Sequence, residues 1–177
     1  MFKGVLIMCA GAIIYATGKS KITELGGLWK KMPITSICFL IASLAIAGLP
    51  FSSGFASKAL VTESLTERGY TIPYLLVTAA GVGTLLSITL KINYFVFFGK
   101  TDRDIDVDEI PNSMSIAIAL GTIVTLFLGI YPDALYNYTT HATVVNPFTI
   151  HHIVEYVAIF IGGTIPFVLY IKKMAPH

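Results

Sequence analysis

The stretch Gly48-Leu49-Pro50-Phe51-Ser52-Ser53-Gly54-Phe55-Ala56-Ser57-Lys58 decides how this chain folds. It interrupts an apolar segment of membrane length with helix-breaking residues and places one lysine just past the interruption. Hydrocarbon offers no partner for a freed backbone group, so a broken helix persists there only where protein buries it or where it lines a wet cavity. An ammonium at that depth is costly unless its surroundings are polar. The helix break (Gly48, Pro50 and Gly54) and Lys58 together therefore indicate ion transport.

The composition indicates a polytopic membrane protein. The 177 residues are 55% apolar and 12% charged, and their mean hydropathy is +0.76. A soluble domain carries about 25% charged residues, so this chain has too few polar side chains to cover a water-facing surface. With a net charge of only +2 and no basic cluster, we expect no nucleic-acid partner. Cys9 and Cys38 lie in apolar segments without metal-ligand or disulfide spacing, and we interpret them as packing residues.

We expect an all-α fold with about five transmembrane helices, one of them broken in mid-membrane. A spanning helix needs about 20 apolar residues. The second segment would run to about 48 Å as one straight helix, well beyond the ~30 Å hydrocarbon core, so it is either one broken, tilted crossing or two short ones. The segments are Met1 to Thr17, Ile34 to about Leu65, Ile72 to Phe98, about Ser113 to Ile130, and about Ile153 to Ile171.

The distribution of positive charge favours the single broken crossing. With one crossing, loop 18–33, loop 99–112 and the C-terminal tail share a side and carry eight lysines and arginines, against Arg68 alone on the other side. With two crossings the split is five against four. Because the cytoplasmic side carries the excess of positive charge, we expect a multi-pass protein of the cell membrane with a cytoplasmic C-terminus. The acidic run 102–109 lacks the glycine and terminal glutamate of a calcium loop, and we expect a solvated loop there and no metal.

Lys58 is the strongest candidate for a functional charge. It lies about one turn beyond Gly54, where freed backbone groups and the hydroxyls of Ser52, Ser53 and Ser57 can hold ordered water. Burial weakens the hold of a lysine on its proton, and a nearby carboxylate strengthens it. A lysine between those two effects can load and unload a proton. The alternative is a lysine whose stem snorkels to an interface.

Two further lysines allow two interpretations each. Lys3 stands at the start of the first segment and, taken alone, is typical of an interfacial lysine. Lys91 precedes Phe98 by seven residues, which places it roughly 10 Å below the cytoplasmic end of its helix. That depth suits either snorkelling to the headgroups or a place on an ion pathway.

Titratable side chains also gather at the outer end of the last segment. His152 and Glu155 are three residues apart and share a helix face, and His151 is adjacent. A histidine can relay protons near neutral pH, so the three form either a proton relay or an interfacial polar cluster. We expect Glu63 and Glu67, on the second half of the broken helix, to be solvated near the outer surface.

Several short motifs are spread along the chain. They are Phe2-Lys3-Gly4-Val5-Leu6-Ile7, Gly11-Ala12-Ile13-Ile14, 24–35, Ala47-Gly48-Leu49-Pro50, Gly54-Phe55-Ala56-Ser57-Lys58, 91–100, Leu128-Gly129-Ile130-Tyr131-Pro132 and 146–155. Together they resemble the antiporter-like subunits of complex I, of Mrp-type Na⁺/H⁺ antiporters, and of membrane-bound hydrogenases and sulfane sulfur reductases. The likeness covers nearly the whole chain, is most specific over the first 60 residues, and in the tail is closer to the Mrp and hydrogenase branch.

The resemblance implies roles for the three lysines. Lys58 matches the charged residue on the broken helix of the C-terminal inverted repeat, which the family uses as a proton site near the outlet. Lys3 matches a lysine of the hydrophilic axis on the helix before it, and Lys91 matches the basic position on the helix after it. Each of the three lysines would therefore be one proton-binding site along a pathway that runs through several helices.

The resemblance also implies that this chain matches only part of a family member. Relatives have about fourteen spans and two inverted repeats. We expect a single membrane domain over 1–177, in which 1–98 form the C-terminal part of one repeat and 113–177 add two further helices. A split gene product, a truncated paralogue or a fragment would each match in this way. We expect another chain to supply the missing repeat.

Two functions follow from these expectations. The first is a membrane subunit of a complex I-related assembly that contributes part of a proton (or Na⁺/H⁺) pathway. It would hold no cofactor, would not be catalytic alone, and would take neighbouring subunits, lipid, H⁺ and possibly Na⁺ as partners. The second is a non-transporting scaffold, a half-antiporter that docks neighbouring subunits and lipid. The retained lysines and helix break favour the first, and the missing repeat favours the second.

Overall fold

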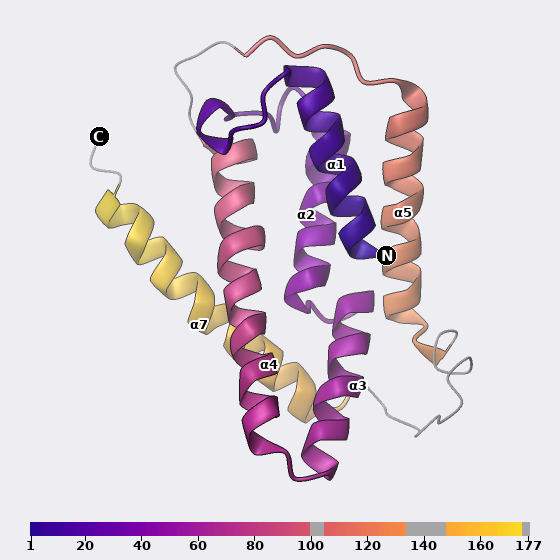
Figure 1. Cartoon of the computed structure of the whole chain (residues 1–177), viewed down its shortest axis with the longest axis vertical. Coiled ribbons are helices and arrows are strands. Elements are labelled where there is room, and N and C mark those ends of the chain that lie inside the picture. The colour runs from indigo at the N-terminus through magenta and orange to yellow at the C-terminus, as the bar shows by residue number, and fades with distance from the viewer. Residues whose placement is uncertain (100–104, 134–147, 175–177) are drawn as a thin grey trace.

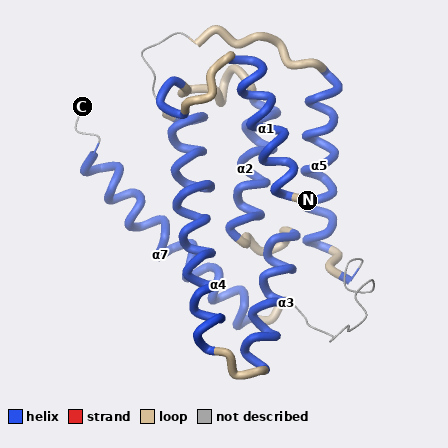
Figure 2. Tube along the Cα trace, in the orientation of Figure 1, coloured by secondary structure: helices blue, strands red, loops and turns tan. Residues whose placement is uncertain are grey.

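The structure is a computed structural model that describes residues 1–99, 105–133 and 148–174 (Figure 1). The described residues form helices and loops, with no strand among them, which confirms the all-α prediction (Figure 2). The helices are α1 (Phe2–Thr17), α2 (Pro33–Ala47), α3 (Ser53–Glu67), α4 (Thr71–Thr84), α5 (Asn112–Ile130) and α7 (Ile150–Met174). A 3₁₀ turn, η1 (Ile22–Glu24), follows α1, and a π-helix, η2 (Leu85–Phe98), continues α4.

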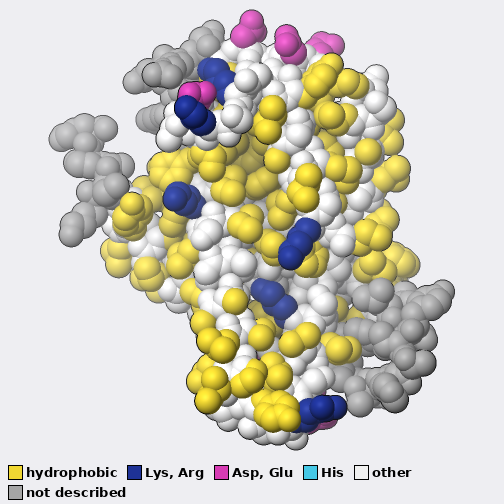
Figure 3. All heavy atoms as spheres, viewed as in Figure 1, with side chains coloured by type: hydrophobic (Ala, Val, Ile, Leu, Met, Phe, Trp, Pro, Cys, Tyr) yellow, Lys and Arg dark blue, Asp and Glu magenta, His cyan; other side chains and the backbone are white. Residues whose placement is uncertain are grey.

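The helices have the character of membrane spans. Thr71–Phe98, Asn112–Ile130 and His152–Lys172 are each long and apolar enough to cross a bilayer, and α1 and α2 are shorter apolar helices. Large apolar side chains point outward, with Ile7 72% and Leu76 66% exposed. Figure 3 shows one such face, with acidic side chains at its upper edge and basic ones there, part-way along and at its lower edge. A surface of this kind suits lipid or protein neighbours, which confirms a polytopic membrane protein.

The two halves of the broken segment run in the same direction, as the single crossing predicted from the charge distribution requires. In Figure 1, α2 runs from the upper end to about mid-height, and α3 continues in the same direction, displaced sideways, to the lower end. The Lys-rich loop 18–32 and the described loop 105–111 lie at the upper end, and the turn with Arg68 lies at the lower end. The strongly tilted α7 climbs from the lower end toward the upper end.

Local backbone chemistry produces the break. Gly48 ends α2 with φ 93° and ψ 37°, a conformation that glycine adopts without the clash of a Cβ. Pro50 follows within the connection, which has no helical structure. Ser52 then starts α3, because its hydroxyl accepts a hydrogen bond of 3.3 Å from the N–H of Phe55 and satisfies one of the free donors of the first turn.

Close backbone contacts fix the two half-helices in place. A Cβ at Gly54 would overlap the carbonyl oxygen of Ala45, and a Cβ at Gly129 would overlap the backbone of Ser52. The first turn of α3 therefore rests on the last turn of α2, and α5 presses against the connection. Gly48 thus supplies both a conformation and room for the Tyr156 ring, whereas Gly54 and Gly129 supply space for neighbouring backbone.

We define the upper half of the bundle as α1, α2, η2 and the parts of α5 and of the loops that contact them. An apolar core fills this upper half. Cys9 and Cys38 are buried there as free thiols, which confirms that they act as packing residues. The loop after α1 is held to η2 by a bond of 3.3 Å from the Leu28 N–H to the Val96 carbonyl. The core residues are Val5, Cys9, Ala12, Ile13, Ala16, Leu28, Met32, Cys38, Phe39, Ala42, Val96, Phe97 and Ile118.

Candidate functional site

The side chain of Lys58 reaches from α3 back to the end of α2. Its Nζ donates to the carbonyl oxygens of Ile46, at 2.9 Å, and Ala47, at 3.2 Å. The last carbonyls of a helix have no partner within the helix, and a positive charge is favourable at that end of the helix dipole. The break and the lysine therefore form one unit, in which the ammonium satisfies backbone groups that the break has freed.

A small cavity adjoins the Lys58 side chain. Its volume of about 10 Å³ is close to the space that one water molecule needs. Gly81 lies beside the ammonium, because a Cβ at that position would be 3.6 Å from the Lys58 Nζ, an ordinary van der Waals contact. Side chains of α3, α4 and α7 line the cavity around the lysine. It is lined by Ala47, Lys58, Thr62, Val77, Thr78, Gly81, Glu155, Tyr156 and Ile159.

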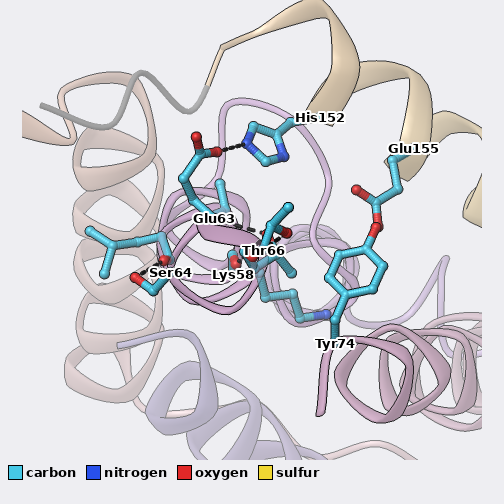
Figure 4. A network of polar contacts seen from close by, with 10 residues as sticks. Lys58, Glu63, Ser64, Thr66, Tyr74, His152 and Glu155 are labelled. Atoms are coloured by element: carbon cyan, nitrogen blue, oxygen red, sulfur yellow. Dashed lines mark hydrogen bonds and ion pairs between the residues drawn. The ribbon is translucent and has the colours of Figure 1, made fainter. Parts of the chain in front are cut away.

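Two side-chain hydrogen bonds lie beyond this cavity, between α7 and the two helices that it faces (Figure 4). The Tyr74 hydroxyl of α4 donates to Glu155 Oε1 of α7 at 2.6 Å. His152 Nε2 of α7 lies 2.6 Å from Glu63 Oε2 of α3. The His152 side chain is 9% exposed and that of Glu63 is 40% exposed. Glu63, expected to be solvated, therefore also serves as the partner of a buried imidazole.

The same four side chains line a larger open cavity at the lower end of the bundle. Its volume is about 570 Å³. Glu155 lines both this cavity and the small one beside Lys58. Its other lining residues come from the end of α3, the turn after it, the start of α4 and the segment before α7. The full lining is Glu63, Leu65, Thr66, Glu67, Gly69, Tyr70, Thr71, Tyr74, Thr149, His152 and Glu155.

The structure unites some of the predicted site residues and separates others. Lys58 and Glu155 share the small cavity, and Glu155 and His152 share the larger one. The exposed Lys3 is in the first turn of α1, whose start lies at about mid-height of the bundle (Figure 1). His151 is on α7, but its side chain lies outside the described part of the chain.

Lys91 lies apart from Lys58. It is exposed on η2 and lines a groove of about 390 Å³ together with Tyr94 and Tyr170. This groove shares no lining residue with the cavity beside Lys58. Lys91 and Lys58 therefore face two separate cavities.

A buried polar network in the upper half escapes sequence reasoning. The Thr89 hydroxyl donates to the Ser43 carbonyl at 2.6 Å, and Asn93 Nδ2 donates to the Ser43 hydroxyl at 2.8 Å. Thr89 and Asn93 are four residues apart and so share a helix face. That spacing within an apolar span is the signal in the sequence that could have identified them.

Fold and site together define the class of protein. The chain is a polytopic helical membrane protein whose broken helix carries a lysine at the break. Residues 1–87 match the family described as "NADH:quinone oxidoreductase/Mrp antiporter, TM". Together with the relatives below, this match shows that the chain belongs to the antiporter-like subunit family, as the motifs predict.

Three relatives illustrate the relationship. NADH-ubiquinone oxidoreductase chain 5 of Dugong dugon is 30% identical over 160 residues, which are 89% of this chain and 26% of the relative. The same-named chain of Phytophthora infestans is 31% identical over 161 residues, 83% of this chain and 24% of the relative. The putative antiporter subunit mnhD2 of Staphylococcus aureus (strain JH9) is 28% identical over 145 residues, 81% of this chain and 29% of the relative. The chain thus spans about a quarter of the length of these relatives.

Proposed function

We propose that this chain is a membrane subunit of a complex I-related assembly and contributes part of a proton (or Na⁺/H⁺) pathway. Family membership supports a place among such subunits, and its relatives carry the names of an oxidoreductase chain and an antiporter subunit. The motifs of the tail add membrane-bound hydrogenases to the candidate assemblies. In this proposal redox chemistry elsewhere in the assembly drives the ion movement.

The hydrogen bonding of Lys58 is the observation that carries the proposal. An ammonium has three N–H donors, and two carbonyl oxygens, those of Ile46 and Ala47, take two of them. The neutral amine still has two N–H groups, enough for the same two carbonyls. The third proton can therefore leave without breaking the contacts that hold the helix break together. Lys58 lines the small cavity, which offers that proton a destination.

Lys3 and Lys91 are the further stations of the proposed pathway. Both are exposed in this structure, and an ammonium within the membrane is costly unless polar groups interact with it. Neighbouring membrane subunits, including one that supplies the missing repeat, would provide it, with lipid filling the remaining surface. For Lys91 the alternative of snorkelling stays open, because its groove is separate from the cavity of Lys58.

The proposed location is the cell membrane with the upper end of the bundle in the cytoplasm. The Lys-rich loop 18–32 lies at that end (Figure 1), and positive loops favour the cytoplasmic side. The tilted α7 climbs toward the same end (Figure 1), which supports a cytoplasmic C-terminus.

A second candidate function is a non-transporting scaffold, and the same hydrogen bonds favour it. An ammonium that caps the carbonyls of Ile46 and Ala47 stabilises a broken helix even if its proton never leaves. In that case Lys58 would be a structural residue, and the chain would dock neighbouring subunits and lipid.

Replacing Lys58 in the assembled complex separates the two functions. We expect Lys58→Ala to abolish or sharply reduce ion pumping while electron transfer stays measurable, because the proton-exchanging group is gone. Pumping and electron transfer would be measured together in sealed membrane vesicles. Lys21→Ala is the matched control, because Lys21 is exposed in the loop at the upper end and should not matter. Unchanged pumping per electron in Lys58→Ala would leave the scaffold as the function.

A further inference from the structure

We infer that Glu155 receives the proton that Lys58 releases, and that Glu155, Tyr74, His152 and Glu63 form its outlet to the lower face of the membrane. The inference rests on the proposed function, because it needs a proton that leaves Lys58. It adds the direction of that proton and the residues that carry it.

The first argument is the position of Glu155 between two cavities. It lines the cavity of about 10 Å³ beside Lys58 and also the open cavity of about 570 Å³ at the lower end. The rest of the small cavity is walled by Ala47, Val77 and Ile159 together with hydroxyl-bearing side chains. Glu155 is the carboxylate in that lining, so a proton can pass from one cavity to the other by binding to it and leaving again.

The chemistry of the transfer is a simple exchange. The Lys58 ammonium gives one proton to a water molecule in the small cavity, and that water passes one of its own protons to the Glu155 carboxylate. Lys58 is then a neutral amine that keeps its bonds to Ile46 and Ala47. The Glu155 carboxylic acid next releases its proton into the open cavity and returns to the carboxylate. No group other than the proton changes partners.

The second argument is the hydrogen bonding of Glu155. The Tyr74 hydroxyl donates to Oε1 at 2.6 Å, which holds the carboxylate in place and leaves Oε2 to accept a proton. The bond also ties α7 to α4, which fixes the boundary between the two cavities.

The third argument is the ion pair that follows along the same wall. His152, one turn before Glu155 on α7, is mostly buried and lies 2.6 Å from Glu63, whose side chain is 40% exposed. An imidazole can accept a proton at one ring nitrogen and donate one from the other, and Glu63 leads from the buried side of the cluster to the open one. The alternative for the whole cluster is an interfacial polar contact that only anchors α7.

Glu155→Gln in the assembled complex tests the outlet. Glutamine keeps the shape and an oxygen to accept the Tyr74 bond, but it cannot take up a proton. We expect pumping per electron to fall to the level of Lys58→Ala, with electron transfer retained. Glu67→Gln is the control, because Glu67 lines the open cavity but not the small one, and it should pump as the unmodified complex does.

The outcomes separate the outlet from the proposed function. Normal pumping in Glu155→Gln with lost pumping in Lys58→Ala would overturn the outlet and leave the proposed function standing. Normal pumping in both variants would overturn both. If Glu155→Gln prevents assembly, Tyr74→Phe replaces it, because it removes the hydroxyl and keeps the carboxylate. A lower number of ions pumped per electron in Tyr74→Phe would support the outlet, and an unchanged number would overturn it.

Discussion

The upper and lower halves of this bundle differ in the contacts that hold their helices together. In the upper half, α1, α2 and η2 pack an apolar core with Phe39 and Phe97 in contact at 5.3 Å between ring centroids. The lower half, which we define as α3, α4 and the first half of α7, buries Phe55 against Tyr156. Its helices are also joined by the Tyr74–Glu155 bond and the Glu63–His152 pair, and Lys58 ties α3 to the end of α2. The break in the second crossing marks the boundary between the two.

The difference teaches where a membrane bundle can keep charges. A packed apolar region has little room for water and few partners for an ion, and Ser43, Thr89 and Asn93 are hydrogen-bonded to one another there. The lower half has cavities on both sides of Glu155 and carbonyls freed by the break. In the proposed function, the lower half provides the sites at which protons bind and leave.

The largest expected effect comes from closing the space at the boundary. Gly54→Ala places a methyl group where the Ala45 carbonyl lies, and since backbone must move, we expect a loss of about 3 kcal/mol or more and failure to assemble. Gly83→Ala is the control, because nothing lies within 4 Å of a Cβ there and alanine suits a helix better by up to about 1 kcal/mol. Complex yield and melting temperature measure both. A Gly54→Ala complex as stable as the control would show that the half-helices are not in contact as described.

An intermediate effect is expected from the ion pair of the lower half. Glu63→Gln, His152→Gln and the double variant form a cycle, and we expect a coupling of about 1 kcal/mol, because His152 is mostly buried and Glu63 lies 2.6 Å from it. Thermal unfolding of the purified complex measures it. Additive losses would mean that the two side chains act independently and that α7 is held by other contacts.

The smallest effect is expected in the upper half. Ser43→Ala removes the acceptor of the Asn93 amide but keeps the carbonyl that accepts from Thr89. Hydrogen bonds between membrane helices contribute on average about 0.6 kcal/mol, so we expect a loss of that order and no change in pumping. Ser64→Ala should cost less, because its hydroxyl bonds within its own helix, to Leu60. A loss of pumping in Ser43→Ala would extend the functional region into the upper half.

The sequence predicts the features that local chemistry determines. Gly48 and Pro50 act within a few residues, so the break follows from the local pattern, whereas the single crossing follows from the distribution of positive charge. The partners of Lys58 do not, because they depend on the sideways displacement of α3 from α2. Gly54 and Gly129 set that displacement through contacts with Ala45 and Ser52.

The contacts made by α7 also cannot be predicted from the sequence. His152 and Glu155 can be placed on one face of a helix from their spacing, but their partners, Glu63 and Tyr74, lie on two other helices. Those pairs form because α7 crosses the bundle at a tilt (Figure 1). A tilt is set by packing against neighbours rather than by the length of the apolar segment.

Lys58→Arg tests the central claim, that Lys58 exchanges a proton rather than only capping α2. Arginine keeps the positive charge and the donors for the Ile46 and Ala47 carbonyls, but it does not release a proton in proteins. The measurement is ion pumping per electron in the assembled complex, with electron transfer as the check on assembly. The account predicts a Lys58→Arg complex that transfers electrons and does not pump. Pumping at the unmodified level would contradict it.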